Sequence, residues 1–186
     1  MAKDSYQNLT PLHFAAMEGT PEAIQVLLEA GAEVMVLGAD KSTPLHLAKT
    51  NENMQILIAY GARVDAKDVS GTTTLMYASM SDQFEAAKLL IKHGADPSSK
   101  NTVENSPLHV AKTGRMVNLL VSAGADVTAR NDGGKTPLHF IAGWQSEENG
   151  AIQALLEAGV DSKIKDYNGR TALDYIKENT FLLNSA

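Results

Sequence analysis

The stretch Thr136-Pro-Leu-His-Phe-Ile-Ala142 decides the fold, because a heptapeptide of this type occurs six times along the chain. Each copy begins with Thr or Ser and has Leu at its third position, and four copies contain Pro-Leu-His. The other five copies are Thr10–Ala16, Thr43–Lys49, Thr73–Ser79, Ser106–Lys112 and Thr171–Lys177. Recurrence at intervals of 30 to 35 residues indicates a protein built from one small repeated unit.

A second marker, Gly followed by Ala or Val, lies twelve residues before each later copy of the heptapeptide. Thr or Ser can cap a helix start with its hydroxyl, and Pro suits the first helical position because its missing N–H is not needed there. The Gly of the second marker accepts the left-handed conformation that ends many helices. Each unit is therefore predicted to hold two helices and an extended arm with a turn at its tip.

This pattern resembles the ankyrin repeat over essentially the whole chain. The resemblance implies an all-α fold, an ankyrin-repeat solenoid of stacked antiparallel helix pairs with protruding β-hairpin or turn arms. Stacking agrees with the physics, since one repeat cannot bury its own apolar face. We expect a single domain over residues 1–186, with residues 1–9 and 171–186 as caps. The repeats are expected to start near Thr10, Thr43, Thr73, Ser106, Thr136 and Thr171.

Long and short repeats alternate along the chain. The distances from the Thr or Ser marker to the next Gly marker are 21, 18, 21, 18 and 23 residues. The three missing residues fall at the end of the first helix and in the turn between the two helices, where about one helical turn should be lost. Either a two-repeat unit duplicated and drifted without functional meaning, or the short helices notch the concave surface. The second interpretation leaves ridges around Met17 to Glu18, Met80 to Ser81 and Gly143 to Trp144.

The arms before both short repeats lack the usual Gly at the turn. Lys41 and Glu104 stand where Gly71, Gly134 and Gly169 stand in the other arms. A residue with a side chain costs roughly 1–2 kcal/mol in the left-handed conformation. These two turns are therefore expected to relax into another geometry.

Composition excludes several classes of function. Of 186 residues, 44% are hydrophobic and 20% charged, which indicates a folded protein. The net charge is −6 and no basic stripe is present, so nucleic acid and anionic lipid are poor partners. The absence of cysteine excludes disulfides and thiol catalysis. No apolar run is long enough to span a membrane, and we expect a cytoplasmic location.

The histidines of the heptapeptide invite a metal hypothesis, which the repeat spacing argues against. Equivalent positions in stacked helices lie about 10 Å apart, whereas bonds from nitrogen to zinc are about 2 Å long. The resemblance implies that these histidines tie helix starts to neighbouring turns. We expect no metal, no cofactor and no enzyme, because the sequence has no G-x-S-x-G, H-E-x-x-H or phosphate-binding loop.

What remains is a protein-binding scaffold that is monomeric by itself and binds another protein. The resemblance implies contacts through the arm tips and first-helix ends on the concave face, where aromatic, Met and Arg side chains favour interfaces. The alternatives are a regulatory or inhibitory subunit that blocks a partner enzyme, a self-associating module, and ordinary scattered exposed side chains. The predicted contact residues are Tyr6, Met17, Glu18, Asp40, Val69, Thr72, Met80, Val103, Asn105, Lys135, Trp144, Tyr167 and Arg170.

Overall fold

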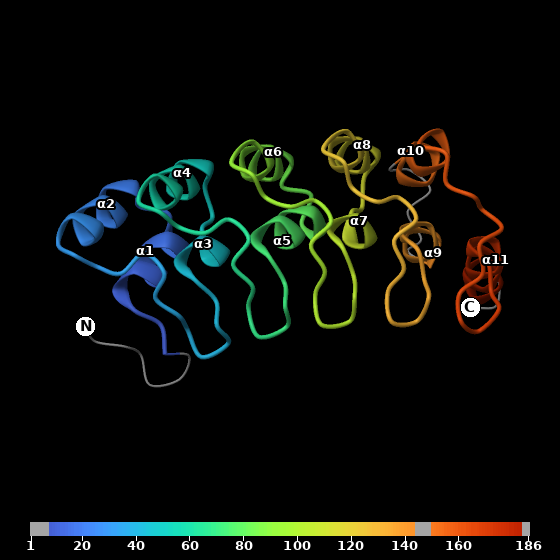
Figure 1. Ribbon diagram of the computed structural model, residues 1–186, viewed down its shortest axis with the longest axis horizontal. Coiled ribbons are helices and arrows are strands. Elements are labelled where there is room, and N and C mark those ends of the chain that lie inside the picture. The colour runs from blue at the N-terminus through green and yellow to red at the C-terminus, as the bar shows by residue number, and fades with distance from the viewer. Residues whose placement is uncertain (1–7, 144–149, 184–186) are drawn as a thin grey trace. The chain divides into compact units, whose positions relative to one another are not determined.

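The computed structural model describes residues 8–143 and 150–183, which form eleven α-helices joined by turns (Figure 1). Predictions made at Tyr6 and Trp144 lie outside these residues. The expected all-α repeat fold is confirmed, and the arms are turns rather than paired strands. Within the described ranges, the one β-bridge joins Lys165 to Thr171 across the last arm.

The chain forms two compact units, and the division passes through α5 (Thr74–Met80) and the start of α6 (Phe84–Lys92). The first unit comprises residues 1–77 and 85–95, and the second comprises residues 78–84 and 96–186. Each unit is described by itself below. The expected single domain stays a prediction.

The first unit packs first helices against second helices in two layers. Its complete helices are α1 (Pro11–Glu18), α2 (Pro21–Glu29), α3 (Pro44–Leu47) and α4 (Asn51–Ala59), with α1 against α2 and α3, and α2 against α4. Figure 1 shows that the arms of this unit extend from the layer of first helices, away from the second helices. Fully buried core side chains come from both layers, among them Leu12, Ile24, Leu45 and Leu57.

The second unit repeats this plan with α7 (Pro107–Val110), α8 (Gly114–Ser122), α9 (Pro137–Gly143), α10 (Ala151–Glu157) and α11 (Ala172–Leu183). Helix α9 packs between α7 and α11, while α10 packs against α8. The core side chains Leu108, Met116, Leu120, Ile141 and Leu155 are fully buried.

Each heptapeptide histidine links its own helix start to the next arm. Nδ1 accepts the backbone N–H of the preceding Thr or Ser at 3.1–3.2 Å, and Nε2 lies 3.1–3.3 Å from a carbonyl oxygen of the arm. A backbone N–H can only donate, so the neutral ring carries its proton on Nε2 and donates it to that carbonyl. The predicted structural role is confirmed for His13 with Ser42, His46 with Thr72, His109 with Lys135, and His139 with Arg170.

The two short repeats have first helices of only four residues, as their spacing predicts. Helices α3 and α7 end where Ala48 and Ala111 turn to extended backbone. The next helix then begins almost at once, because the hydroxyl oxygens of Thr50 and Thr113 accept N–H groups from the first turns of α4 and α8. The Ala-Lys-Thr sequence shared by both repeats therefore ends one helix and caps the next.

The expected relaxation of the turns at Lys41 and Glu104 is wrong. Both residues are left-handed, with φ of 61° and 60°. Their turns keep the hydrogen bonds of the glycine-containing arms: Lys41 N–H donates to the Gly38 carbonyl, and Glu104 N–H to that of Asn101. The hydrogen bonds that close the arm stabilise the left-handed conformation of these two residues and offset its cost in free energy.

Candidate functional site

The arm tips are closed by one side chain at a fixed position, seven residues after each Gly marker. Its Oδ1 accepts the backbone N–H groups two and four residues later, at 2.8–3.1 Å. Asp and Asn favour such turns because their short side chains reach their own backbone. The residues are Asp68, Asn101, Asn131 and Asp166. In the first arm Gly38 stands at this position, and Asp40 Oδ1 accepts the Ser42 N–H instead.

Neighbouring tips are joined by main-chain hydrogen bonds. In the first unit, Val69 N–H donates to the Asp40 carbonyl at 2.7 Å. In the second unit, Asp132 N–H donates to the Val103 carbonyl at 3.3 Å and Tyr167 N–H to that of Gly133 at 3.0 Å. Because backbone atoms make these links, the side chains at the tips are not used in them. Val69 is 58%, Val103 48% and Tyr167 71% exposed.

The predicted contact residues occupy several environments. Glu18, Asp40, Val69, Met80, Val103 and Tyr167 are exposed, and Met17, Asn105, Lys135 and Arg170 are half-buried. Thr72 was expected at an exposed tip, but it is only 8% exposed. Its backbone explains the burial: the Thr72 N–H donates to Asp68 Oδ1, and its carbonyl faces His46 Nε2. The surface formed by the arm tips and first helices of a unit is called its arm face here.

Two tyrosine–aspartate pairs on the arm faces were not anticipated. Tyr77 donates its hydroxyl to Asp68 Oδ2 at 2.6 Å, and Tyr175 donates to Asp166 Oδ2 at 2.7 Å. Burial, together with the carboxylate of Asp68, raises the pKa of Tyr77 to about 12. The sequence contains a signal for both pairs. Only these two repeats have Tyr four residues after the Thr marker, and in both of them Asp lies five residues before the same Thr.

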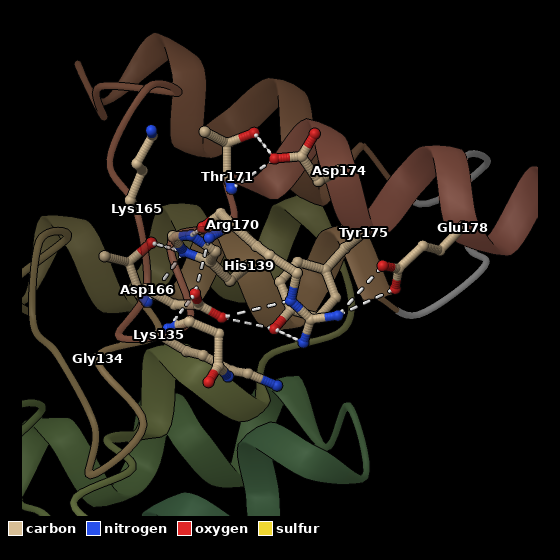
Figure 2. A network of polar contacts seen from close by, with 12 residues as sticks. Gly134, Lys135, His139, Lys165, Asp166, Arg170, Thr171, Asp174, Tyr175 and Glu178 are labelled. Carbon is tan, nitrogen blue, oxygen red and sulfur yellow. Dashed lines mark hydrogen bonds and ion pairs between the residues drawn. The ribbon is translucent and has the colours of Figure 1, made fainter.

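Two cations of the second unit also lie close to the ring of Tyr175 (Figure 2). Lys135 Nζ lies 4.7 Å from the Tyr175 ring centroid and 5.8 Å from that of Phe140, and Arg170 Cζ lies 4.2 Å from that of Tyr175. Lys135 and Arg170 occupy the same position of successive arms, immediately before the Thr marker. The four residues Phe140, Lys135, Tyr175 and Arg170 form what we call the cation–ring stack. Each cation over a ring face is attracted by the ring's quadrupole.

Carboxylates complete the surroundings of Arg170. Its Nη1 donates to both Glu178 carboxylate oxygens at 3.2 Å, and its Nη2 to the Tyr175 hydroxyl at 2.5 Å. Asp166 is buried, which opposes ionisation, but hydrogen bonds from Tyr175, Arg170 and Asn168 outweigh burial and lower the pKa of Asp166. Its charge is therefore satisfied inside the arm, while Glu178 is exposed.

Two further findings concern the described part of the chain. No helix in it is long and apolar enough to cross a membrane. No group of three or more His, Asp or Glu residues within residues 8–143 and 150–183 is arranged to hold a metal ion.

Comparison with known proteins gives matches along nearly the whole chain. The family model for ankyrin repeats (3 copies) matches residues 12–101, 54–131 and 108–180. The B-cell lymphoma 3 protein homolog of Mus musculus is 35% identical over 119 residues, which is 62% of this chain and 27% of that protein. The putative palmitoyltransferase ZDHHC13 of Danio rerio is 37% identical over 176 residues, covering 92% of this chain and 22% of that protein.

A third relative is the transient receptor potential cation channel subfamily A member 1 homolog of Caenorhabditis elegans. It is 32% identical over 181 residues, which is 95% of this chain and 15% of the channel protein. The matched segment therefore spans only 15–27% of the length of these three relatives.

Proposed function

Because the chain belongs to the ankyrin-repeat family, whose repeats are protein–protein interaction modules, we propose that it binds a partner protein through its arm faces, without catalysis and in the cytoplasm. The observation that carries the proposal is the closure of the arm tips by backbone and Asx hydrogen bonds. This closure leaves Val103 about half exposed and Val69 and Tyr167 more than half exposed, although the backbone of each tip is held by hydrogen bonds. A tip backbone that is already held by hydrogen bonds loses little conformational entropy on binding, which favours affinity.

The test compares two triple variants that remove similar exposed apolar groups from different faces. The arm-face variant carries Val69→Ala, Val103→Ala and Tyr167→Ala. The control variant carries Val26→Ala, Tyr60→Ala and Leu156→Ala, all exposed on the second helices or at their ends. Each chain would be immobilised, partners captured from native lysate and identified by mass spectrometry, and the affinity of the purified partner then measured.

Removing aromatic and aliphatic contacts from an interface typically costs more than 1 kcal/mol for each residue that matters. The arm-face variant is therefore expected to lose at least tenfold in partner affinity, with unchanged circular dichroism, while the control variant binds as the parent does. Equal affinity of a folded arm-face variant and the parent would refute the proposal. An activity assay on the captured partner then distinguishes a scaffold from an inhibitory subunit.

A further inference from the structure

We propose that the cation–ring stack of the second unit is a docking site for an acidic segment of the partner protein, with Lys135 as its principal contact. The inference rests on the proposed function and names the chemistry of the partner. Although the whole chain has a net charge of −6, this part of the arm face presents cations. Figure 2 shows Lys135 and Arg170, from two neighbouring arms, near Tyr175.

Lys135 is the first reason. Its ammonium group lies over the rings of Phe140 and Tyr175 and, within the described residues, makes no ion pair. Its backbone is fixed, since its N–H donates to Asn131 Oδ1 at 3.0 Å and its carbonyl faces His109 Nε2 at 3.1 Å. A half-buried, positioned cation without a carboxylate loses less entropy on pairing than a freely rotating surface lysine does.

Arg170 is the second reason. Two other cations of these arms are used internally: the Lys100 side chain donates to the Arg130 carbonyl, and the Arg130 side chain donates to the Lys165 carbonyl. Arg170, in contrast, already holds an exposed carboxylate, that of Glu178, on the outer edge of its guanidinium group. Glu178 therefore shows that this edge accepts a carboxylate, and it occupies the place that a partner carboxylate would take.

Asp166 offsets part of the charge of Arg170 from inside the arm, since its Oδ2 lies 3.9 Å from Arg170 Nε, and leaves Lys135 as the cation of the stack that makes no ion pair within the described residues. The Asp166 side chain is fully buried, and it accepts two backbone N–H groups and the Tyr175 hydroxyl. An approaching partner meets Lys135 and the Arg170 edge, with Glu178 as the competing group. A short acidic peptide with one carboxylate near each cation fits this arrangement, and the adjacent exposed Tyr167 supplies apolar contact.

Selection of peptides tests the proposal directly. A phage-displayed library of random dodecapeptides would be panned on the intact chain, and the selected peptides synthesised and titrated by fluorescence anisotropy. Three variants compare charge at single positions: Lys135→Met, Glu178→Gln, and Lys163→Met as a control. Lys163 is an exposed lysine of the same unit, so its substitution changes the net charge as Lys135→Met does while leaving the stack intact.

The selected peptides are expected to carry Asp or Glu at recurring positions. Their affinity should fall at least tenfold for Lys135→Met, change less than twofold for Lys163→Met, and rise several-fold for Glu178→Gln, because the competing carboxylate is gone. Affinity should also fall with added salt. Peptides without acidic enrichment, or equal losses for the two lysine variants, would overturn the docking site.

Failure of the proposed function has a different signature. Peptides that bind equally to the parent and to the variant with Val69→Ala, Val103→Ala and Tyr167→Ala would contradict binding at the arm face itself. The same conclusion follows if the panning selects no peptide. Peptides whose affinity falls for that triple variant but not for Lys135→Met would support binding at the arm face and contradict the docking site for an acidic segment.

Discussion

Replacing His109 with glutamine is expected to reduce the loss of stability that acid causes in this protein. His109 is fully buried, and its Nδ1 accepts both the backbone N–H and the hydroxyl of Ser106, while Nε2 donates to the Lys135 carbonyl. A proton added to Nδ1 would face the Ser106 N–H, so protonation must break this cap. Burial, the largest cause, lowers the pKa of His109 from 6.5 to about 4.

The sign follows from the two pKa values. Between pH 6.5 and pH 4 the unfolded chain binds a proton at His109 while the folded chain does not, so the free energy of unfolding falls as the pH falls. Above pH 6.5 both states are neutral at this residue and it contributes no pH dependence. A difference of about 2.5 in pKa corresponds to about 3 kcal/mol, as an order of magnitude.

Urea unfolding followed by circular dichroism at several pH values from 7 to 4 measures this contribution. The parent should lose about 3 kcal/mol more over that range than His109→Gln does, whatever the difference between them at pH 7. The substitution His93→Gln, at an exposed histidine, serves as the control and should follow the parent. Parallel loss of stability by the parent and His109→Gln would refute the reasoning.

Three further substitutions test individual contacts. Gly134→Ala should destabilise the second unit by more than the roughly 1–2 kcal/mol of a left-handed residue, because the added Cβ would lie 2.5 Å from the Tyr167 ring; Tyr167→Ala should restore part of the loss. Lys41→Gly should raise the melting temperature, since Gly removes the cost of a φ of 61°. Tyr77→Phe should cost about 1–2 kcal/mol, because Asp68 Oδ2 loses its 2.6 Å hydrogen bond.

These three substitutions and their controls are compared by urea unfolding and by melting temperature, both followed by circular dichroism. Gly169→Ala also places Ala in a left-handed turn, but no atom lies within 4 Å of the added Cβ, so it should cost less than Gly134→Ala. Tyr60→Phe removes the hydroxyl of an exposed tyrosine and should be neutral. A lower melting temperature for Lys41→Gly would mean that the left-handed turn carries no strain, and a neutral Tyr77→Phe would mean that Asp68 is satisfied without the hydroxyl.

The sequence predicted the parts of the fold that depend on local pattern. The spacing between markers predicted that the first helices of the short repeats, α3 and α7, would be about one turn shorter than the others, because helix length follows directly from residue number. The conformation at Lys41 and Glu104 was mispredicted. The prediction considered only the free-energy cost of a left-handed residue and left out the hydrogen bonds that close the arm. The burial of Thr72 was missed for a similar reason, since its carbonyl is held by a histidine from the preceding repeat.

The candidate site was predicted only in outline. Arg170 and Lys135 were chosen as arm-tip residues, but their shared contact with Tyr175 joins successive arms and is not visible in any one repeat. The tyrosine–aspartate pairs could have been found by comparing repeats position by position, because Asp and Tyr change together. Glu178 had no such signal, since its contact with Arg170 depends on where α11 places it.

The main-chain links between neighbouring tips have a consequence for engineering. Since the hydrogen bonds of Val69, Val103 and Tyr167 to adjacent arms use only backbone atoms, they survive a change of side chain at these positions. Proline is the exception at all three positions, because the N–H groups of Val69 and Tyr167 donate to adjacent arms and that of Val103 donates to Asn101 Oδ1. A combinatorial library that varies these three side chains should therefore retain the fold, which makes the protein a starting scaffold for selecting new binding specificities.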